Sequence, residues 1–193
     1  KGSFGSPGKA RKAGFNQVST SYVTFWDADD IAYASNIQTS LRDVDSTIDY
    51  IVGSYEIFDA NNLTTIKVNS SGLPKKLKLA AEPAIWRIVF KTKSLASVAF
   101  GKSLMGEDQV FLMSSGIFDS GNIYFSSQTF YKYFTNLRGQ LTSKNRLNGH
   151  ILLSVRELTT QMRNAKIPGR YFGSVIFVKL WVTLLKRIIK GQS

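Results

Sequence analysis

The sequence predicts an α/β protein with a mixed sheet and flanking helices, followed by amphipathic helices at the C-terminus. Short runs of β-branched and aromatic residues alternate with helical segments, Gly and Pro punctuate these runs, and the residues after 143 show helical periodicity. With 193 residues, 43% of them hydrophobic, the chain can form one domain with a core. It contains no cysteine, which excludes disulfides and thiolate metal sites.

The expected elements of the α/β part follow from local composition. Residues 22–26 (YVTFW) predict a buried strand that ends abruptly in acidic residues. The elements expected after it are a helix at 34–41, strands at 50–58, 63–68 and 84–90, a helix at 109–114, and strands at 122–126 and 130–134. Their alternation favours a layered α/β arrangement.

The residues after 143 differ from the preceding ones in composition and periodicity. Apolar residues recur at helical spacing over 151–162, Pro168-Gly169 interrupts the pattern, and 172–190 is strongly apolar. Its polar residues fall on one narrow helical face: Lys179, Thr183, Lys186, Arg187 and Lys190. We therefore divide the chain into an α/β part, 1–142, and a basic amphipathic helical tail, 143–193.

Positive charge is concentrated in the C-terminal part of the chain, from residue 121 onward. The formal net charge is +12, and residues 121–193 carry 12 Lys or Arg against one acid, Glu157. Such a split indicates a polyanionic partner, either an anionic membrane or a nucleic acid. Residues 175–189 would span ~22 Å as a helix, less than a ~30 Å hydrocarbon core, so we expect an interfacial helix. The alternative is a helix packed on its own domain with lysine tips reaching water.

Two acidic clusters are the candidate chemical groups. Asp27, Asp29 and Asp30 follow an apolar strand, where their mutual repulsion favours a bound cation, and Mn²⁺ or Mg²⁺ prefers such oxygen ligands. The alternative is a solvated acidic turn, with Asp30 as a helix cap or structural acid. Glu107-Asp108 heads an expected helix, where a carboxylate could take a proton from an attacking hydroxyl. The alternative is two acids that stabilise a helix N-terminus.

Four motifs in register resemble family 2 glycosyltransferases, across roughly residues 5–142. The motifs are GKARKAG at 8–14, SYVTFWDADD at 21–30, AIWR at 84–87 with GEDQ at 106–109, and YKY at 131–133 followed by GQLT at 139–142. The resemblance implies a GT-A (Rossmann-like) fold, with the N-terminal part of the domain missing. The family's first βαβ unit, which binds the nucleotide base, has no counterpart in residues 1–20.

The resemblance also implies a role for each matched residue. Asp108 is the implied catalytic base and Glu107 shapes the acceptor pocket. Asp29 is the implied ligand of the metal and diphosphate, and Asp27 lies near the donor and reaches the metal. Arg11 lies close to the donor, while Trp86 and Arg87 contact the acceptor, although Trp86 could equally belong to the core. Lys12 stands where the family usually has Asn, so the chain departs from the family pattern at this donor contact.

These observations lead to one preferred function and two alternatives. We expect a metal-dependent, inverting transfer of a single sugar from a nucleotide sugar to a glycan or lipid-linked acceptor, because the Gln-x-x-Arg-Trp signature of processive synthases is absent. We expect a cytoplasmic protein, peripheral on the inner face of the membrane, and no nucleic-acid partner. The alternatives are a basic module that binds nucleic acid or another polyanion through its aromatic residues, and an inactive truncated chain. His150, the single histidine, lies beyond the matched motifs and is given no role.

Overall fold

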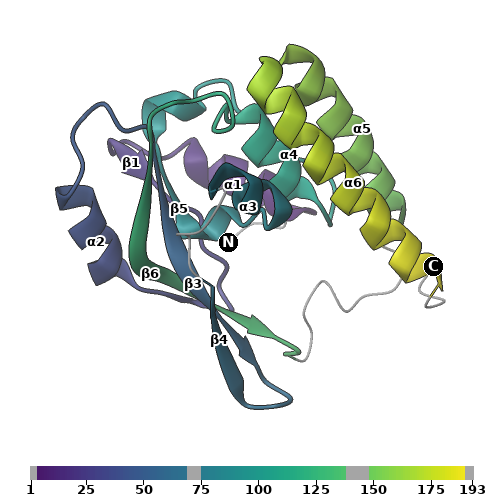
Figure 1. Cartoon of the computed structure of the whole chain (residues 1–193), viewed down its shortest axis with the longest axis horizontal. Helices are drawn as coiled ribbons and strands as arrows, with labels where there is room; N and C mark the ends of the chain where they lie inside the picture. The colour runs from purple at the N-terminus through teal and green to yellow at the C-terminus, as the bar shows by residue number, and fades with distance from the viewer. Residues whose placement is uncertain (1–3, 69–74, 138–147, 190–193) are drawn as a thin grey trace.

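The computed structural model shows an α/β fold with helices on both faces of one mixed sheet (Figure 1). It describes residues 4–68, 75–137 and 148–189. The strands are β1 (Tyr22–Val23), β2 (Ile31–Ala32), β3 (Tyr50–Asp59), β4 (Thr64–Val68), β5 (Ile88–Lys91) and β6 (Ile123–Thr135). The α-helices are α1 (Pro7–Phe15), α2 (Ala34–Arg42), α3 (Lys75–Ala81), α4 (Glu107–Ser114), α5 (Asn148–Asn164) and α6 (Ile167–Ile189), and two 3₁₀ turns lie at Ile85–Arg87 and Thr92–Leu95. The predicted fold class is confirmed.

The sheet has the strand order β1-β5-β3-β6-β2, with β4 paired to β3. The central pair, β3 and β6, is parallel, and the other pairs are antiparallel. Parallel strands need a crossover connection, and here it runs through β4, α3, β5 and α4. This crossover places α4 over one face of the sheet, while α2 covers the other face (Figure 1).

Four expected strands differ from the observed ones. Only 22–23 of 22–26 pair in the sheet; Phe25 instead packs into the core, with its ring 5.3 Å from that of Phe111, so this stretch is apolar because it is buried. The 84–90 segment begins with a 3₁₀ turn and becomes β5 at Ile88. The strands expected at 122–126 and 130–134 form one strand, β6, because a register shift opposite Gly53 absorbs the intervening polar residues.

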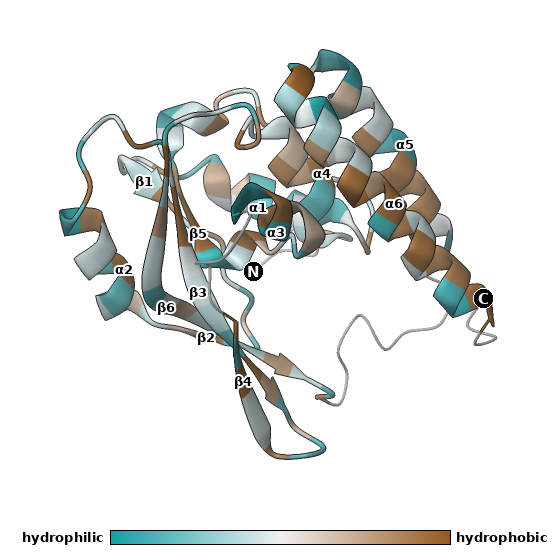
Figure 2. Cartoon of the chain, in the orientation of Figure 1, coloured by the Kyte–Doolittle hydropathy of each residue, from teal (hydrophilic) through white to brown (hydrophobic). Residues whose placement is uncertain are grey.

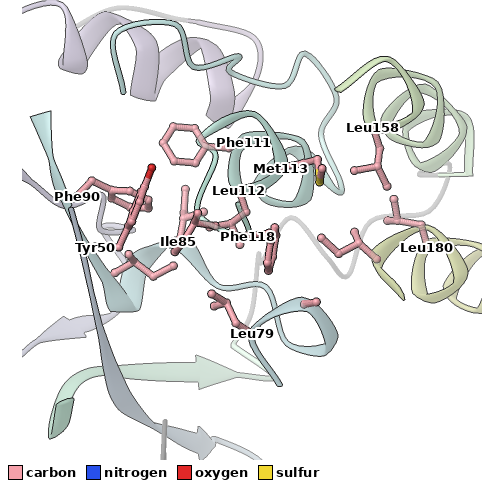
Figure 3. Packing of buried hydrophobic residues seen from close by; sticks show 14 of the residues in the cluster. Tyr50, Leu79, Ile85, Phe90, Phe111, Leu112, Met113, Phe118, Leu158 and Leu180 are labelled. Atoms are coloured by element: carbon pink, nitrogen blue, oxygen red, sulfur yellow. The ribbon is translucent and has the colours of Figure 1, made fainter. Parts of the chain in front are cut away.

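One hydrophobic core joins the sheet to the C-terminal helices. It runs from Tyr50 and Phe90 in the sheet, through Phe111 in α4, to Leu158 in α5 and Leu180 in α6 (Figure 3). The helical region is therefore packed on the α/β part through a shared core. The boundary predicted at 142/143, the 139–142 motif and Lys190 lie outside the described residues.

The junction between α5 and α6 is fixed by a capping carboxylate. Asp119 accepts hydrogen bonds from the backbone N–H of Lys166, at 3.0 Å, and of Gly169, at 2.7 Å. Pro168 needs no such partner because it has no N–H, so the Pro168-Gly169 pair lies in the first turn of α6, which begins at Ile167 close to the predicted break. Over the described residues, neither α6 nor any other helix is both long and apolar enough to cross a bilayer.

The aromatic residues of β6 are structural. Phe130 and Tyr131 are fully buried, and Tyr124, Phe125 and Tyr133 pack against the same hydrophobic clusters. A platform for stacking nucleic-acid bases needs exposed ring faces. The burial of Phe130 and Tyr131 and the packing of the other three rings therefore weaken the aromatic argument for the polyanion-binding alternative.

Candidate functional site

The two acidic clusters line one pocket of about 660 Å³. The 27–30 loop joins β1 to β2, and Glu107 and Asp108 begin α4, so the pocket lies between the sheet edge and the N-terminus of a helix. Its charged lining consists of five acidic and two basic residues: Asp27, Asp29, Asp30, Glu107, Asp108, Arg11 and Lys179. This excess of carboxylates would repel a diphosphate unless a cation lay between them.

Asp30 is a structural acid in the first cluster. Its Oδ2 accepts a hydrogen bond of 2.9 Å from the Tyr131 hydroxyl, and its Oδ1 accepts one of 2.8 Å from the Phe134 N–H. Burial raises the pKa of Asp30, and these two hydrogen bonds partly oppose the increase. Asp30 therefore ties the loop to β6, in agreement with the structural alternative that the sequence left open; the N-cap position of α2 is Tyr33.

Tyr131 positions the 27–30 loop through its hydroxyl. Its hydroxyl accepts a 3.0 Å hydrogen bond from the Asp27 N–H and donates to Asp30, so one oxygen fixes both ends of the acidic turn. The ring is fully buried and stacks on Trp86, with centroids 4.5 Å apart and planes 18° apart. Burial raises the pKa of Tyr131, which keeps the hydroxyl a hydrogen-bond donor. The sequence resemblance marked Tyr131 without revealing this positioning role.

Asp29 and Asp27 remain accessible from the pocket. Asp29 is exposed, and the side chain of Asp27 keeps 39% of its surface in contact with solvent. Asp27 is partly engaged, because its Oδ1 accepts a 3.0 Å hydrogen bond from Arg11. Asp29 is therefore the carboxylate of this cluster most available to a cation.

Arg11 bridges the two acidic clusters. Its Nη2 contacts Asp27, while Nη1 donates to Asp108 Oδ1 at 2.7 Å and to Glu107 Oε1 at 3.1 Å. Burial pulls the pKa of Arg11 downward, but the three carboxylates outweigh burial and raise it above its usual value. The guanidinium is therefore a permanent cation at the point where the strand-end loop and the α4 N-terminus meet.

The position of Arg11 depends on a close helix contact. Ser6 caps α1 by accepting a hydrogen bond from the Lys9 N–H, and Pro7 occupies the first turn. Gly8 then faces the backbone of Gly101, where a Cβ would lie 1.9 Å from the carbonyl oxygen. A side chain at position 8 would push α1 outward and carry Arg11 away from α4.

Asp108 has the properties of a proton acceptor near neutral pH. Burial raises its pKa to about 7; Arg11 opposes this increase, whereas Glu107 and Asp27 add to it. Among the described residues its hydrogen-bond partner is Arg11, through Oδ1, which leaves Oδ2 to accept a proton. A base with a pKa near the working pH combines a large ionised fraction with useful basicity.

The implied acceptor residues occupy different places. Trp86 lines the pocket and also stacks with Tyr131 and with Tyr133, so it is both core and pocket wall. Arg87 is only 1% exposed and is not part of the pocket lining. Its Nη2 donates to the Glu82 carbonyl at 3.0 Å and its guanidinium lies over the Tyr55 ring. The geometry does not bring Arg87 into contact with pocket contents.

Three residues that line the two pockets were not expected there from the sequence. Lys179 of α6 lines the pocket and donates a hydrogen bond to the Ala81 carbonyl; burial lowers its pKa. The buried Oε1 of Gln109 lacks a partner among the described residues. So does the buried Oγ1 of Thr24, which lines a second pocket of about 480 Å³ that shares Arg11 and Asp27 with the first. Orphaned polar atoms of this kind have no signature in sequence.

Two neighbouring residues have structural explanations. Gly106 adopts φ +89, and a Cβ there would lie 2.9 Å from Ser154 and 3.2 Å from Leu180. This glycine is therefore required by backbone conformation and by helix packing, and ligand approach is not needed to explain it. His150 accepts a 3.3 Å hydrogen bond from the Leu104 N–H through Nδ1, which ties α5 to the pocket wall.

The carboxylates suit one mode of metal binding. In the described part of the chain, no group of three or more His, Cys, Asp or Glu side chains is arranged to hold an ion. A hard divalent ion at a phosphate site, however, is commonly held by one or two carboxylates, the substrate phosphates and water. Exposed Asp29 and half-exposed Asp27 fit that second mode.

Comparison with known proteins defines the fold. No protein-family model matches the sequence, and no curated protein matches it. Among solved structures, the chain is similar to S. aureus TarS 1–349 in complex with UDP-GlcNAc, with a TM-score of 0.68 and 16% identity. The similarity covers 92% of this chain and 53% of TarS 1–349, so the chain spans about half of that structure. The fold is therefore glycosyltransferase-like.

Proposed function

We propose that the chain binds a nucleotide sugar and transfers a single sugar, with inversion, to a hydroxyl of a glycan or lipid-linked acceptor. The observation that carries this proposal is Asp108, whose side chain is 19% exposed and which Arg11 holds in the pocket that also contains Asp27 and Asp29. The nucleotide sugar bound to the structural neighbour supports the donor class. Assignment to family 2 and to the GT-A type rests on the sequence motifs.

In this proposal Asp29 and Asp27 are the residues that would hold Mn²⁺ or Mg²⁺ together with the donor diphosphate. The ion supplies Lewis-acid stabilisation of the diphosphate as it departs. Asp29 is the main ligand because it is exposed, and Asp27 adds a weaker contact because Arg11 already engages one of its oxygens. Arg11 lies beside the donor, at the point where the first pocket adjoins the second one, which contains Thr24.

Asp108 acts as the general base. Its Oδ2 takes the proton of the acceptor hydroxyl, a new bond forms between that oxygen and the sugar's anomeric carbon, and the bond to the diphosphate breaks. One displacement of this kind inverts the anomeric centre. Arg11 orients the carboxylate through Oδ1, and Glu107, bonded to the same guanidinium, shapes the acceptor side of the pocket. Trp86 offers an apolar wall there.

Nucleoside-diphosphate release tests this proposal. The chain is incubated with a panel of nucleotide sugars, with and without Mn²⁺, beside Asp108→Asn and a matched control, Asp43→Asn. Asp43 is exposed at the end of α2, remote from the pocket lining. Metal-dependent release that disappears only in Asp108→Asn supports the transferase. Release independent of Asp108, or no release by folded protein with glycan and lipid-linked acceptors present, contradicts it and favours the inactive alternative.

A further inference from the structure

Helix α6 is apolar on two opposite faces. One face is buried in the shared core through Gly169, Gly173, Ile176, Leu180 and Leu184. The opposite face carries exposed large apolar residues at spacings of three, four and seven, which is one side of a helix: Ile167, Tyr171, Val178, Val182, Leu185 and Ile189. Ile167 and Ile189, at the two ends of this row, are 83% and 84% exposed. We call these six residues the apolar row.

The packing of α6 on the rest of the fold does not use the apolar row. The buried face already packs α6 against α5 and the core, and the row lies on the far side of the helix. Figure 2 shows hydrophobic residues along most of α6, in contrast to the mixed colouring of α2. A row of exposed apolar side chains of this length is uncommon on a soluble domain and marks an interaction site.

The charge around the row identifies its partner. Arg170 and Lys186 are exposed, and at about 100° per residue they fall on opposite edges of the row. Arg156, Arg163 and Lys166 add exposed positive charge on and after α5. The acid of this region, Glu157, accepts a hydrogen bond from the Lys102 N–H. A second copy of the chain would bring these cations together. Anionic lipid would complement them, and its acyl region would take up the apolar residues.

We propose that the apolar row and its basic edges dock this chain on an anionic lipid bilayer, with α6 lying in the membrane interface. The same helix places Lys179 in the pocket lining. Docking through α6 would therefore hold the pocket beside the lipid headgroups, where a lipid-linked acceptor would be presented. Lipid binding does not require that the proposed sugar transfer occurs, so the two proposals can fail separately.

Vesicle co-sedimentation tests the docking surface. The whole chain is mixed with phosphatidylcholine vesicles, with and without phosphatidylglycerol, and at low and high salt. We expect binding to the anionic vesicles that weakens as salt rises. Val178→Asp with Leu185→Asp should weaken this binding by about tenfold or more, because each aspartate removes apolar area and adds repulsion. Arg170→Gln with Lys186→Gln should reduce both the binding and its salt dependence.

A matched pair of substitutions on another surface controls for the general effect of replacing exposed apolar residues by aspartate. Leu63 and Ile66, at the turn before β4 and within it, are 76% and 61% exposed and lie away from α6. Leu63→Asp with Ile66→Asp should leave vesicle binding unchanged. All four aspartate positions are exposed, so circular dichroism should show folded protein in both variants. Equal loss of binding in both pairs would overturn the proposal.

Two other results would also overturn it. One is the absence of binding to any vesicle by folded protein. The other is a concentration-dependent dimer that Val178→Asp with Leu185→Asp abolishes, which would identify a second copy of the chain as the partner. Equal binding to neutral and anionic vesicles would likewise contradict the role assigned to Arg170 and Lys186.

Discussion

The two acidic clusters of the pocket resemble each other in sequence and differ in environment. In the 27–30 loop, Asp29 is exposed, Asp27 is half-exposed and Asp30 is bonded to β6. At the start of α4, Asp108 is held by Arg11 and its pKa is raised to about 7 by burial. Exposed carboxylates suit a cation, whereas a carboxylate with a raised pKa suits proton transfer. Burial therefore separates groups that composition cannot distinguish.

The largest expected effect comes from removing the proposed base. Asp108→Asn keeps the size of the side chain and a carbonyl oxygen for Arg11 but cannot accept a proton, so turnover should fall by about 10²- to 10⁴-fold. The measurement is the rate of nucleoside-diphosphate release at saturating donor and metal. Glu107→Gln is the internal comparison and should lose less. A similar loss in the two variants would remove the distinction between base and pocket wall.

The metal dependence should separate Asp29 from Asp30. Asp29→Asn removes the exposed charge and should raise the Mn²⁺ concentration needed for half-maximal activity by about tenfold or more. Asp30→Asn should leave that concentration near the wild-type value, because both oxygens of Asp30 are occupied by Tyr131 and Phe134. The measurement is a metal titration of activity. The reverse ranking would make Asp30 the ligand and contradict the structural role given to it.

The pH dependence should follow Asp108. A base must be ionised, so with a pKa of about 7 activity should rise by about tenfold between pH 6 and pH 8 and then level off. Arg11 opposes the increase in the pKa of Asp108, so Arg11→Met should move the rise to higher pH. A pH profile of the release rate measures both. A flat profile across this range would argue against Asp108 as the base.

Stability should show the opposite trend with pH. The folded state favours the protonated form of Asp108, so its contribution to the free energy of unfolding is largest below the ordinary aspartate pKa of about 4. That contribution is lost as pH rises toward about 7. Asp108→Asn removes this dependence and should therefore be more stable than the wild type at pH 8, as measured by urea denaturation across pH. An equal free energy of unfolding for the variant and the wild type at pH 8 would mean that burial does not disfavour the charged form of Asp108.

The smallest expected effect tests the support of the loop. Tyr131→Phe leaves the Asp27 N–H and Asp30 Oδ2 without their buried partner, so the free energy of unfolding should fall by about 1–3 kcal/mol. Tyr33→Phe is the matched control, because it removes one 3.2 Å hydrogen bond to Glu56 at a less buried position. Urea denaturation measures both variants. Equal losses would show that Tyr131 has no special role beneath the loop.

The site residues chosen from the sequence lie together in one pocket, and the roles given to them stay predictions. Asp27, Asp29, Glu107, Asp108 and Arg11 were all singled out, and the structure brings them to one pocket. Strand boundaries were less reliable. Phe25 and Trp86 look like strand residues because they are apolar, yet Phe25 is buried outside the sheet and Trp86 lies in a 3₁₀ turn.

For charged residues in the C-terminal helices, too, the sequence pattern did not reveal the tertiary environment. Within the described residues, 172–189 was correctly expected to be helical, but an amphipathic pattern does not reveal which neighbour the helix has. Lys179 looked like a solvent-facing lysine and instead lines the pocket, because α6 packs beside the end of α3. The exposed apolar row was hidden in the sequence, since a helix with two apolar faces reads as uniformly hydrophobic.

By itself, the sequence determined the α/β class, the helical C-terminus, the uneven charge and the acidic residues of the pocket, because these depend on local composition and periodicity. Only the tertiary structure decided that Asp30 is structural, that Arg87 is enclosed away from the pocket, and that Arg11 joins the two clusters. Those outcomes depend on burial and on contacts between residues up to about a hundred positions apart. No local pattern encodes such contacts, and the chemistry of each carboxylate follows from them.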